Sequence, residues 1–140
     1  MEQKPGPLDG VAQAESGIAA EAAGLDALYG HLSATEIIER SVSELFSGKI
    51  AAVSSFGADS AVLLHLIAQV DRNLPIVFLD TGKHFEETLS YRDALAADFG
   101  LTDIRVVTPD EAALARIDPS GRLHETNVDA CCDVRKVEPM

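Results

Sequence analysis

Short apolar runs alternate along this chain with longer stretches in which apolar residues recur three and four positions apart. The short runs, which are typical of strands buried in a parallel sheet, are 49–53, 76–79 and 103–107. Helical spacing fills the stretches around them, at 33–48, 60–70 and 84–99. This alternation predicts βαβ units and an α/β fold, an open parallel sheet with helices on both faces.

Start and stop signals support these elements. Ser33 and Glu36 have the spacing of a capping box, and Gly48 and Gly100 stand where helices would stop. Apolar residues expected to face the core are Ile37, Ile38, Val42, Leu45 and Phe46 in the first helix, Val62, Leu63, Leu66, Ile67 and Val70 in the second, and Phe85, Leu89, Ala96 and Phe99 in the third.

The two ends of the chain are less regular. Residues 1–30 combine prolines, glycines and alanines with little periodicity, which predicts a flexible leader before a domain at 31–140. Near the other end, Pro109 and Asp110 mark the start of a short helix, and 118–121 break it. We expect a loop up to about Asn127 and a helix from Ala130 to Pro139.

The residues after the first strand suit an anion. Ser54, Ser55, Gly57 and Ser60 offer hydroxyls, a glycine and free backbone N–H groups at a helix start. The alternative is an ordinary turn with Asp59 or Ser60 as the helix cap. Neither the Walker A pattern nor the dinucleotide fingerprint is present.

A second polar, glycine-bearing loop follows the next strand, at 80–84. Ligands of open parallel sheets lie outside the carboxyl ends of the strands, so both loops are expected to share one site. Asp80 could equally cap a turn, and Lys83 and His84 could be solvated charges. A nucleotide or another anion is the favoured ligand.

Composition narrows the partners. The chain has 140 residues, 46% of them hydrophobic, and a net charge of −12, which disfavours nucleic acid and anionic membranes. No apolar run is long enough to cross a bilayer. Neighbouring Cys131 and Cys132 are poor material for a disulfide, so a reducing, cytoplasmic location is expected.

Three motifs in order, 54–60, 79–85 and 131–139, resemble those of assimilatory adenylyl-sulfate reductases, the iron–sulfur branch of the phosphoadenylyl-sulfate reductase family. The resemblance covers residues 33–140. It implies an adenine nucleotide α-hydrolase-like (PP-loop) fold, incomplete at the C-terminus. It also implies the thioredoxin-dependent reduction of adenylyl sulfate to sulfite and AMP, as part of sulfate assimilation.

The resemblance also assigns residues. Substrate-binding positions would be Ser54, Ser55, Phe56, Gly57, Asp59, Ser60, Leu79, Asp80, Thr81, Gly82, Arg135 and Lys136. Phe56 replaces a glycine of ATP-splitting relatives, which disfavours ATP cleavage. Cys131 and Cys132 would supply two of the four thiolates of a [4Fe–4S] cluster. The alternatives are an inert cysteine pair and, for Arg135, a surface ion pair.

The family's nucleophilic cysteine and its second cysteine pair have no counterpart before Met140, so no catalytic nucleophile is assigned and Lys136 has a supporting role. We therefore expect a fragment that has no reductase activity alone and that associates into a homo-oligomer through an uncovered sheet edge. Cys131 or Cys132 as nucleophile remains an alternative. Other possible functions are reduction of the 3′-phosphorylated substrate, an ATP-using adenylating enzyme and a non-catalytic nucleotide-binding module.

Overall fold

The computed structural model describes the backbone of residues 7–140 and the side chains of residues 17–140. Contacts divide the chain after Ile37 into two units. The predicted boundary lay near residue 30. Each unit is described here by itself.

The first unit holds a helix that the sequence did not predict, α1 (Pro7–Tyr29). Among its described side chains, only Tyr29 is even partly buried. The flexibility expected of residues 1–30 stays a prediction, and residues 1–6 lie outside the described part. The predicted capping box is confirmed, because the Ser33 N–H and hydroxyl both donate to Glu36 Oε2, at 2.9 and 2.6 Å.

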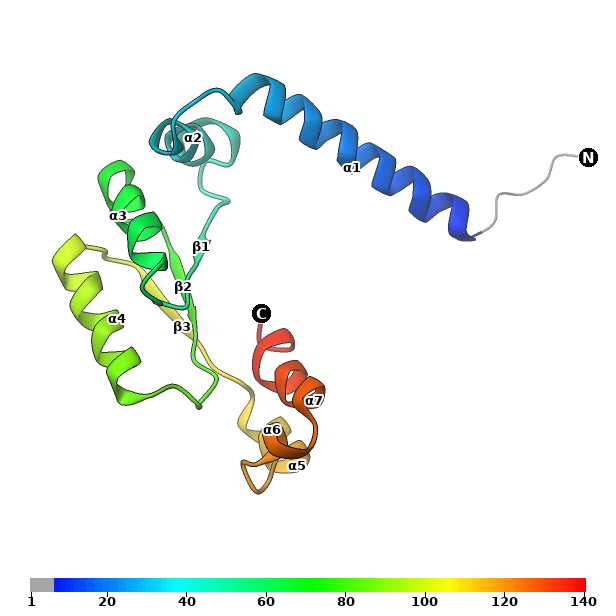
Figure 1. Cartoon of the computed structure of the whole chain (residues 1–140), viewed down its shortest axis with the longest axis vertical. Helices are drawn as coiled ribbons and strands as arrows, with labels where there is room; N and C mark the ends of the chain where they lie inside the picture. Colours follow the sequence, from blue (N-terminus) through cyan, green and yellow to red (C-terminus); the bar gives the residue numbers. More distant parts are fainter. Residues whose placement is uncertain (1–6) are drawn as a thin grey trace, which may run out of the picture. The chain divides into compact units, whose positions relative to one another are not determined.

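The second unit alternates strands with helices in the order that the sequence predicts (Figure 1). This unit begins within α2 (Ala34–Arg40). The elements that follow are the π-helical turn η1 (Ser41–Leu45), β1 (Ala52–Val53), α3 (Ser60–Val70), β2 (Ile76–Leu79), α4 (Glu86–Phe99), β3 (Ile104–Val107), α5 (Glu111–Ile117), α6 (Leu123–Thr126), α7 (Val128–Cys132) and the π-helical turn η2 (Asp133–Val137).

The three strands form one parallel sheet in the order β1-β2-β3. Ile76 is paired with Ala52 on one side and with Ile104 on the other. Both crossovers contain a helix, α3 and then α4, as parallel neighbours require. The predicted α/β class is confirmed.

The core lies between the sheet and the two crossover helices, which run side by side in Figure 1. Ile76 and Phe78 of β2 and Leu64 of α3 are fully buried there, and Leu95 of α4 is 8% exposed. Gly100 ends α4 in the left-handed conformation, with φ 68°, and its N–H donates to the carbonyls of Ala96 and Ala97.

The two faces of the sheet are covered unequally in the described structure. Alternate residues of a strand point to opposite faces, so Val53 and Val77 lie opposite to the buried Ile76. Val53 is 58% exposed and Val77 is partly buried. An apolar face of this kind agrees with the expected tendency to associate, which stays a prediction.

Several predicted core positions are wrong. Leu64 replaces Val62 and Leu63 as an inward residue of α3, because the helix is rotated by about one position from the predicted stripe. Phe85 is 77% exposed, because it precedes α4 in an extended conformation and does not share its inner face. Ile37, Leu45 and Phe46 are also exposed.

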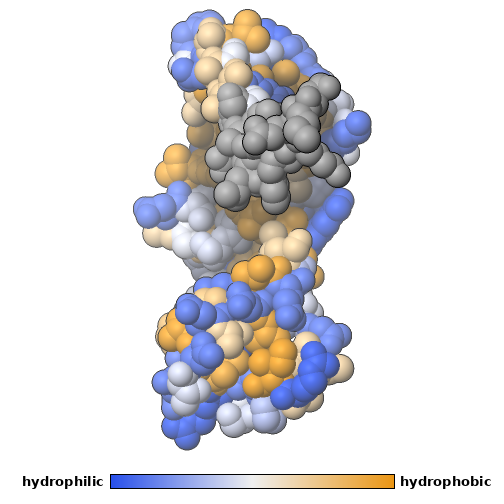
Figure 2. Space-filling model, turned by 90° about the vertical axis from the view of Figure 1, so that its right-hand side faces the viewer, coloured by the Kyte–Doolittle hydropathy of each residue, from blue (hydrophilic) through white to orange (hydrophobic). Residues whose placement is uncertain are grey.

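The stretch before Asn127, predicted as a loop, contains the four-residue helix α6, and α7 begins at Val128, two residues earlier than expected. Asn127 explains the early start, since its side chain accepts a hydrogen bond from the Ala130 N–H at 3.0 Å. The lower part of Figure 2, where Figure 1 places α5 to α7, shows apolar surface between polar patches. Val128 of α7 and Val137 of η2 are exposed. None of the described helices has the length and apolar character that a bilayer crossing needs.

Candidate functional site

The loops after β1 and β2 leave the sheet at the same edge. β1 and β2 are parallel neighbours, with Val53 paired to Val77, so their carboxyl ends point the same way. This is the edge at which open parallel sheets bind ligands. The predicted placement of the loops 54–60 and 80–84 at one edge of the sheet is therefore confirmed, and a site shared by both loops stays a prediction.

The first loop is a turn built around Ser54. Its hydroxyl is buried and accepts a hydrogen bond from the Phe56 N–H at 3.0 Å. Ser55, Gly57 and Asp59 are exposed, and the Asp59 side chain makes no capping bond to α3. The Ser54 hydroxyl is therefore used within the turn, whereas Ser55 is exposed and Ser60 is partly buried.

Phe56 has a φ of 54°, in the left-handed region that favours glycine. Its ring is 1% exposed and packs edge to face on Phe78, with ring centroids 5.7 Å apart and planes at 78°. The strained backbone therefore delivers an aromatic ring to the core. The Phe56 side chain packs in the core, so it does not face the ligand that it was predicted to contact.

The second loop is a tight turn. The Asp80 carboxylate accepts from the Gly82 N–H at 2.9 Å, which confirms the turn-capping alternative for Asp80. Gly82 has a φ of 69°, which only glycine adopts readily. His84 stacks on Phe78 with centroids 5.0 Å apart, and its Nε2 lies 3.0 Å from the Leu79 carbonyl oxygen. The carbonyl can only accept, so Nε2 carries the proton.

The third predicted motif lies on α7 and η2. Cys131 is buried and Cys132 is partly buried, and both are free thiols. Lys136 follows one turn later and is exposed, and its ammonium has no partner within the described residues. Val134 is buried and anchors this turn. The fold therefore presents two thiols and one ammonium from a single helical segment.

Arg135 is 6% exposed and bridges two distant segments. Its Nη1 donates to the Thr81 carbonyl at 2.8 Å, and its Nη2 donates to Asp118 Oδ2 at 2.7 Å. The Nε atom is buried without a partner in the described part of the chain. The alternative of a surface ion pair for Arg135 is wrong, because its partner Asp118 is itself only 5% exposed.

The Asp118 carboxylate is well supported. Its second oxygen, Oδ1, accepts from the Leu123 N–H at 3.0 Å. The hydrogen bond from Arg135 holds the pKa of Asp118 below its ordinary value, with a further lowering from the Leu123 N–H and from nearby positive charges. Asp118 is therefore a charged carboxylate at neutral pH.

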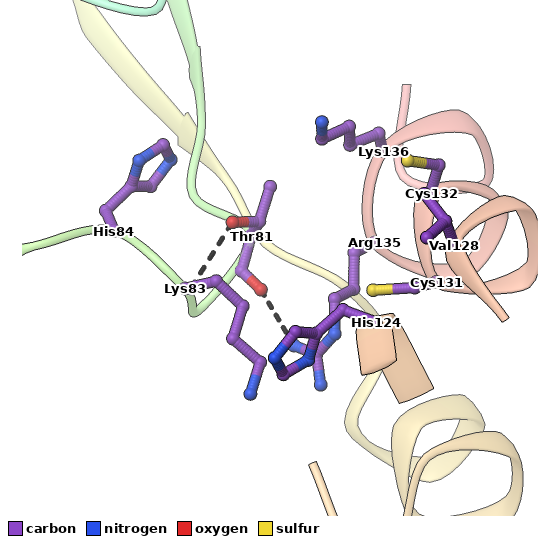
Figure 3. A pocket seen from close by; sticks show the side chains of 9 residues that line it. All are labelled: Thr81, Lys83, His84, His124, Val128, Cys131, Cys132, Arg135 and Lys136. Atoms are coloured by element: carbon purple, nitrogen blue, oxygen red, sulfur yellow. Dashed lines mark hydrogen bonds between the residues drawn. The ribbon is translucent and has the colours of Figure 1, made fainter. Parts of the chain in front are cut away.

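The segment of α7 and η2 that carries Cys131 and Cys132 is called the cysteine helix here. A cavity of about 460 Å³ opens between it and the second loop (Figure 3). Its wall carries both thiols, and Figure 3 shows their sulfur atoms on the side of the helix that faces the loop. The lining residues are Thr81, Lys83, His84, His124, Val128, Cys131, Cys132, Arg135 and Lys136. In a chain of net charge −12, the two lysines in this wall, Lys83 and Lys136, supply local positive charge, whereas the charge of Arg135 is paired with Asp118.

Of the predicted site residues, the cavity brings together Thr81, Arg135, Lys136, Cys131 and Cys132. Those that do not line it are Ser54, Ser55, Phe56, Gly57, Asp59, Ser60, Leu79, Asp80 and Gly82. Neither His124, which lines the cavity, nor Asp118, which binds Arg135, was among the predicted site residues. Asp118 was noted only as part of a helix break, and no spacing signal pairs it with Arg135, which is 17 residues away.

The donor set fits part of an iron–sulfur site. Both thiols reach one cavity, and Lys136 adds a positive charge that would offset anionic thiolates. The described residues hold no group of three or more histidine, cysteine or carboxylate side chains able to bind a metal. A [4Fe–4S] cluster needs four ligands, so the pair accounts for two of them.

Comparison with known proteins identifies the family. The model of the phosphoadenosine phosphosulfate reductase domain matches residues 49–140. A Mesorhizobium japonicum protein named adenosine 5'-phosphosulfate reductase is 73% identical over all 140 residues, which are 55% of its length. A protein of the same name from Chelativorans sp. is 54% identical over the whole chain, which covers 54% of it. The chain thus spans about half the length of these curated relatives.

A solved structure shares the fold. The phosphoadenylyl-sulfate (PAPS) reductase from Candida auris, in a phosphate complex, superimposes with a TM-score of 0.65 at 24% identity. The match covers 83% of this chain and 57% of that one. The structural match shows the shared fold, and the domain match over residues 49–140 shows that the chain belongs to the phosphoadenosine phosphosulfate reductase domain family.

Proposed function

We propose that this chain carries the nucleotide-binding part of an adenylyl-sulfate reductase that works in sulfate assimilation. The reaction converts adenylyl sulfate to sulfite and AMP, and a thioredoxin-like dithiol supplies the two electrons and becomes a disulfide. The observation that carries the proposal is the cavity in which Cys131, Cys132 and Lys136 face the loop after β2. The names of the 73% and 54% identical relatives support it.

The substrate would lie along the carboxyl edge of the sheet, in the manner of PP-loop proteins. Exposed backbone N–H groups and hydroxyls of the loop 54–60 would hold the phosphosulfate. The adenosine would lie against 79–82. Lys83 and Lys136 supply positive charge at the cavity wall, where a doubly charged anhydride would gain most.

Cys131 and Cys132 would supply two thiolates of a [4Fe–4S] cluster, which in the bound state would contribute its charge and its redox chemistry near the substrate. Within this chain, Lys136 would stabilise the thiolates and the substrate anion together. The test is iron content after reconstitution. Cys131→Ser and Cys132→Ser should each lower the amount of iron bound relative to the wild-type chain. An iron content in either variant equal to that of the wild type would contradict the assignment.

Two features favour adenylyl sulfate over its 3′-phosphorylated form. The relatives that match over the entire chain have the adenosine 5'-phosphosulfate name, whereas a Gloeobacter violaceus phosphoadenosine 5'-phosphosulfate reductase is 37% identical over 76% of the chain. The cysteine pair also belongs to the branch that uses the simpler substrate. An ATP-using enzyme is disfavoured by the buried Phe56 in the loop.

The reaction implies two partners, adenylyl sulfate and a dithiol protein. A second copy of the chain is a third, and it would cover the sheet face on which Val53 is exposed among the described residues. The location would be the cytoplasm, where thiols stay reduced. The deciding experiment is a titration of the purified protein with adenylyl sulfate, its 3′-phosphorylated form and ATP. The tightest binding is expected for adenylyl sulfate. Pyrophosphate release from ATP would instead indicate an adenylating enzyme.

A further inference from the structure

The cysteine helix and the loop after β2 are joined by few contacts, and one of them is buried. The Arg135 guanidinium spans the gap, with one nitrogen on the Thr81 carbonyl and another on Asp118 (Figure 3 shows the Thr81 bond). All three residues are at most 8% exposed. Neither the loop nor the helix segment has another buried polar bond to the other among the described residues.

A second link joins the loop to the turn that carries Asp118. Lys83 Nζ donates to the Gly121 carbonyl at 2.5 Å. Lys83 is exposed and Gly121 is partly buried. An exposed lysine contact adds little to the free energy of unfolding. The Asp118 to Arg135 pair, in contrast, is shielded from water and geometrically complete on the carboxylate side, with both oxygens bonded.

We propose that Asp118 is a positioning residue: by holding Arg135, it fixes the cysteine helix against the loop after β2 and so sets the width of the cavity. Arg135 then acts mainly as a brace, since two of its donors are committed to protein groups. Lys83 and Lys136 are left as the cationic groups that meet an anion. The ligand arm of the test below rests on the proposed function, and the thiol arm does not.

The geometry explains why a carboxylate is needed at this position. A neutral amide at 118 would keep the acceptor for the Leu123 N–H but would lose the charge that holds a guanidinium in a buried place. Arg135 would then turn toward water and release the Thr81 carbonyl. Gly82 lies close to the same guanidinium, since a Cβ added there would be 3.5 Å from Arg135 Nη1.

The test compares Asp118→Asn with Asp118→Glu and with Leu64→Ala, a core substitution in α3. Leu64→Ala is the control for a general loss of stability. Denaturant is added to the more stable of Leu64→Ala and Asp118→Asn until the two have the same free energy of unfolding. The first readout is the alkylation rate of Cys131 and Cys132 by iodoacetamide in the iron-free chain, resolved by mass spectrometry. The second readout is the Kd for adenylyl sulfate.

In Asp118→Asn, we expect alkylation of the buried Cys131 to be about tenfold faster than in the stability-matched Leu64→Ala variant, because the helix opens locally. The Kd for adenylyl sulfate should rise by about tenfold, since misplaced binding groups lose affinity. Asp118→Glu should recover part of both effects, because it restores the charge.

Equal alkylation rates in Asp118→Asn and the matched Leu64→Ala variant would show that Asp118 only contributes to overall stability, and this would overturn the inference. So would faster alkylation with an unchanged Kd, because the cavity would then not depend on the brace. If the wild-type chain fails to bind adenylyl sulfate, the proposed function fails, and the alkylation rates still decide whether Asp118 positions the helix.

Discussion

Replacing Phe56 by alanine and by glycine separates two opposing terms at one position. The ring is 1% exposed, so Phe56→Ala removes a buried aromatic side chain, which costs about 3–5 kcal/mol of the free energy of unfolding. The φ of 54° costs a residue with a Cβ about 1–2 kcal/mol, which glycine avoids. Glycine pays about 0.5–1 kcal/mol for its extra freedom when unfolded.

The sum predicts that Phe56→Gly is as stable as Phe56→Ala or more stable, by up to about 1.5 kcal/mol. Phe78 is the matched control, because it is fully buried against Phe56 but lies in the strand β2. There, Phe78→Gly should be less stable than Phe78→Ala by about 0.5–1 kcal/mol. Urea denaturation of the four variants measures both differences. A glycine variant that is the less stable one at both positions would refute the strain argument.

Three further predictions concern charge and backbone. Lys136→Ala should raise the Kd for adenylyl sulfate about tenfold in a calorimetric titration, whereas Lys49→Ala, at the opposite end of the sheet, should leave it unchanged. Because the pKa of Asp118 is lowered, its stabilising contribution is present above about pH 3.8 and is lost as the pH falls below; the difference in unfolding free energy between wild type and Asp118→Asn should therefore shrink from pH 7 to pH 3. Gly100→Ala should lower the free energy of unfolding by about 1–2 kcal/mol because of its φ of 68°, and Gly57→Ala, whose φ is not positive, should lower it less.

Local signals in the sequence were sufficient for the order of strands and helices. Apolar runs and helix stops such as Gly100 act within a few residues, so strands β2 and β3 and helix α3 agree with the predicted ranges within about one residue. Helix rotation was harder to predict. α3 is apolar on most sides, so its period does not say which side meets the sheet, and Leu64 was missed.

The candidate site, too, has features that local sequence signals predict and features that they do not. The two loops at the carboxyl edge and the cysteine pair were predicted, because strand ends and motif spacing are properties of short segments. The roles of single side chains were not. Arg135 was expected at the ligand, and its pairing with Asp118 depends on how α5 and η2 pack, which no local pattern encodes. Phe56 was expected among the substrate-binding positions, and its ring lies in the core.

The central claim is that the cavity between the loop after β2 and the cysteine helix binds adenylyl sulfate. Isothermal titration of the purified protein with adenylyl sulfate, for wild type and for Lys136→Ala, tests it most directly. The account predicts one site per chain in the wild type, weaker binding of ATP, and a Kd that rises in the variant. Equal affinity of both proteins for adenylyl sulfate, or tighter binding of ATP, would contradict it.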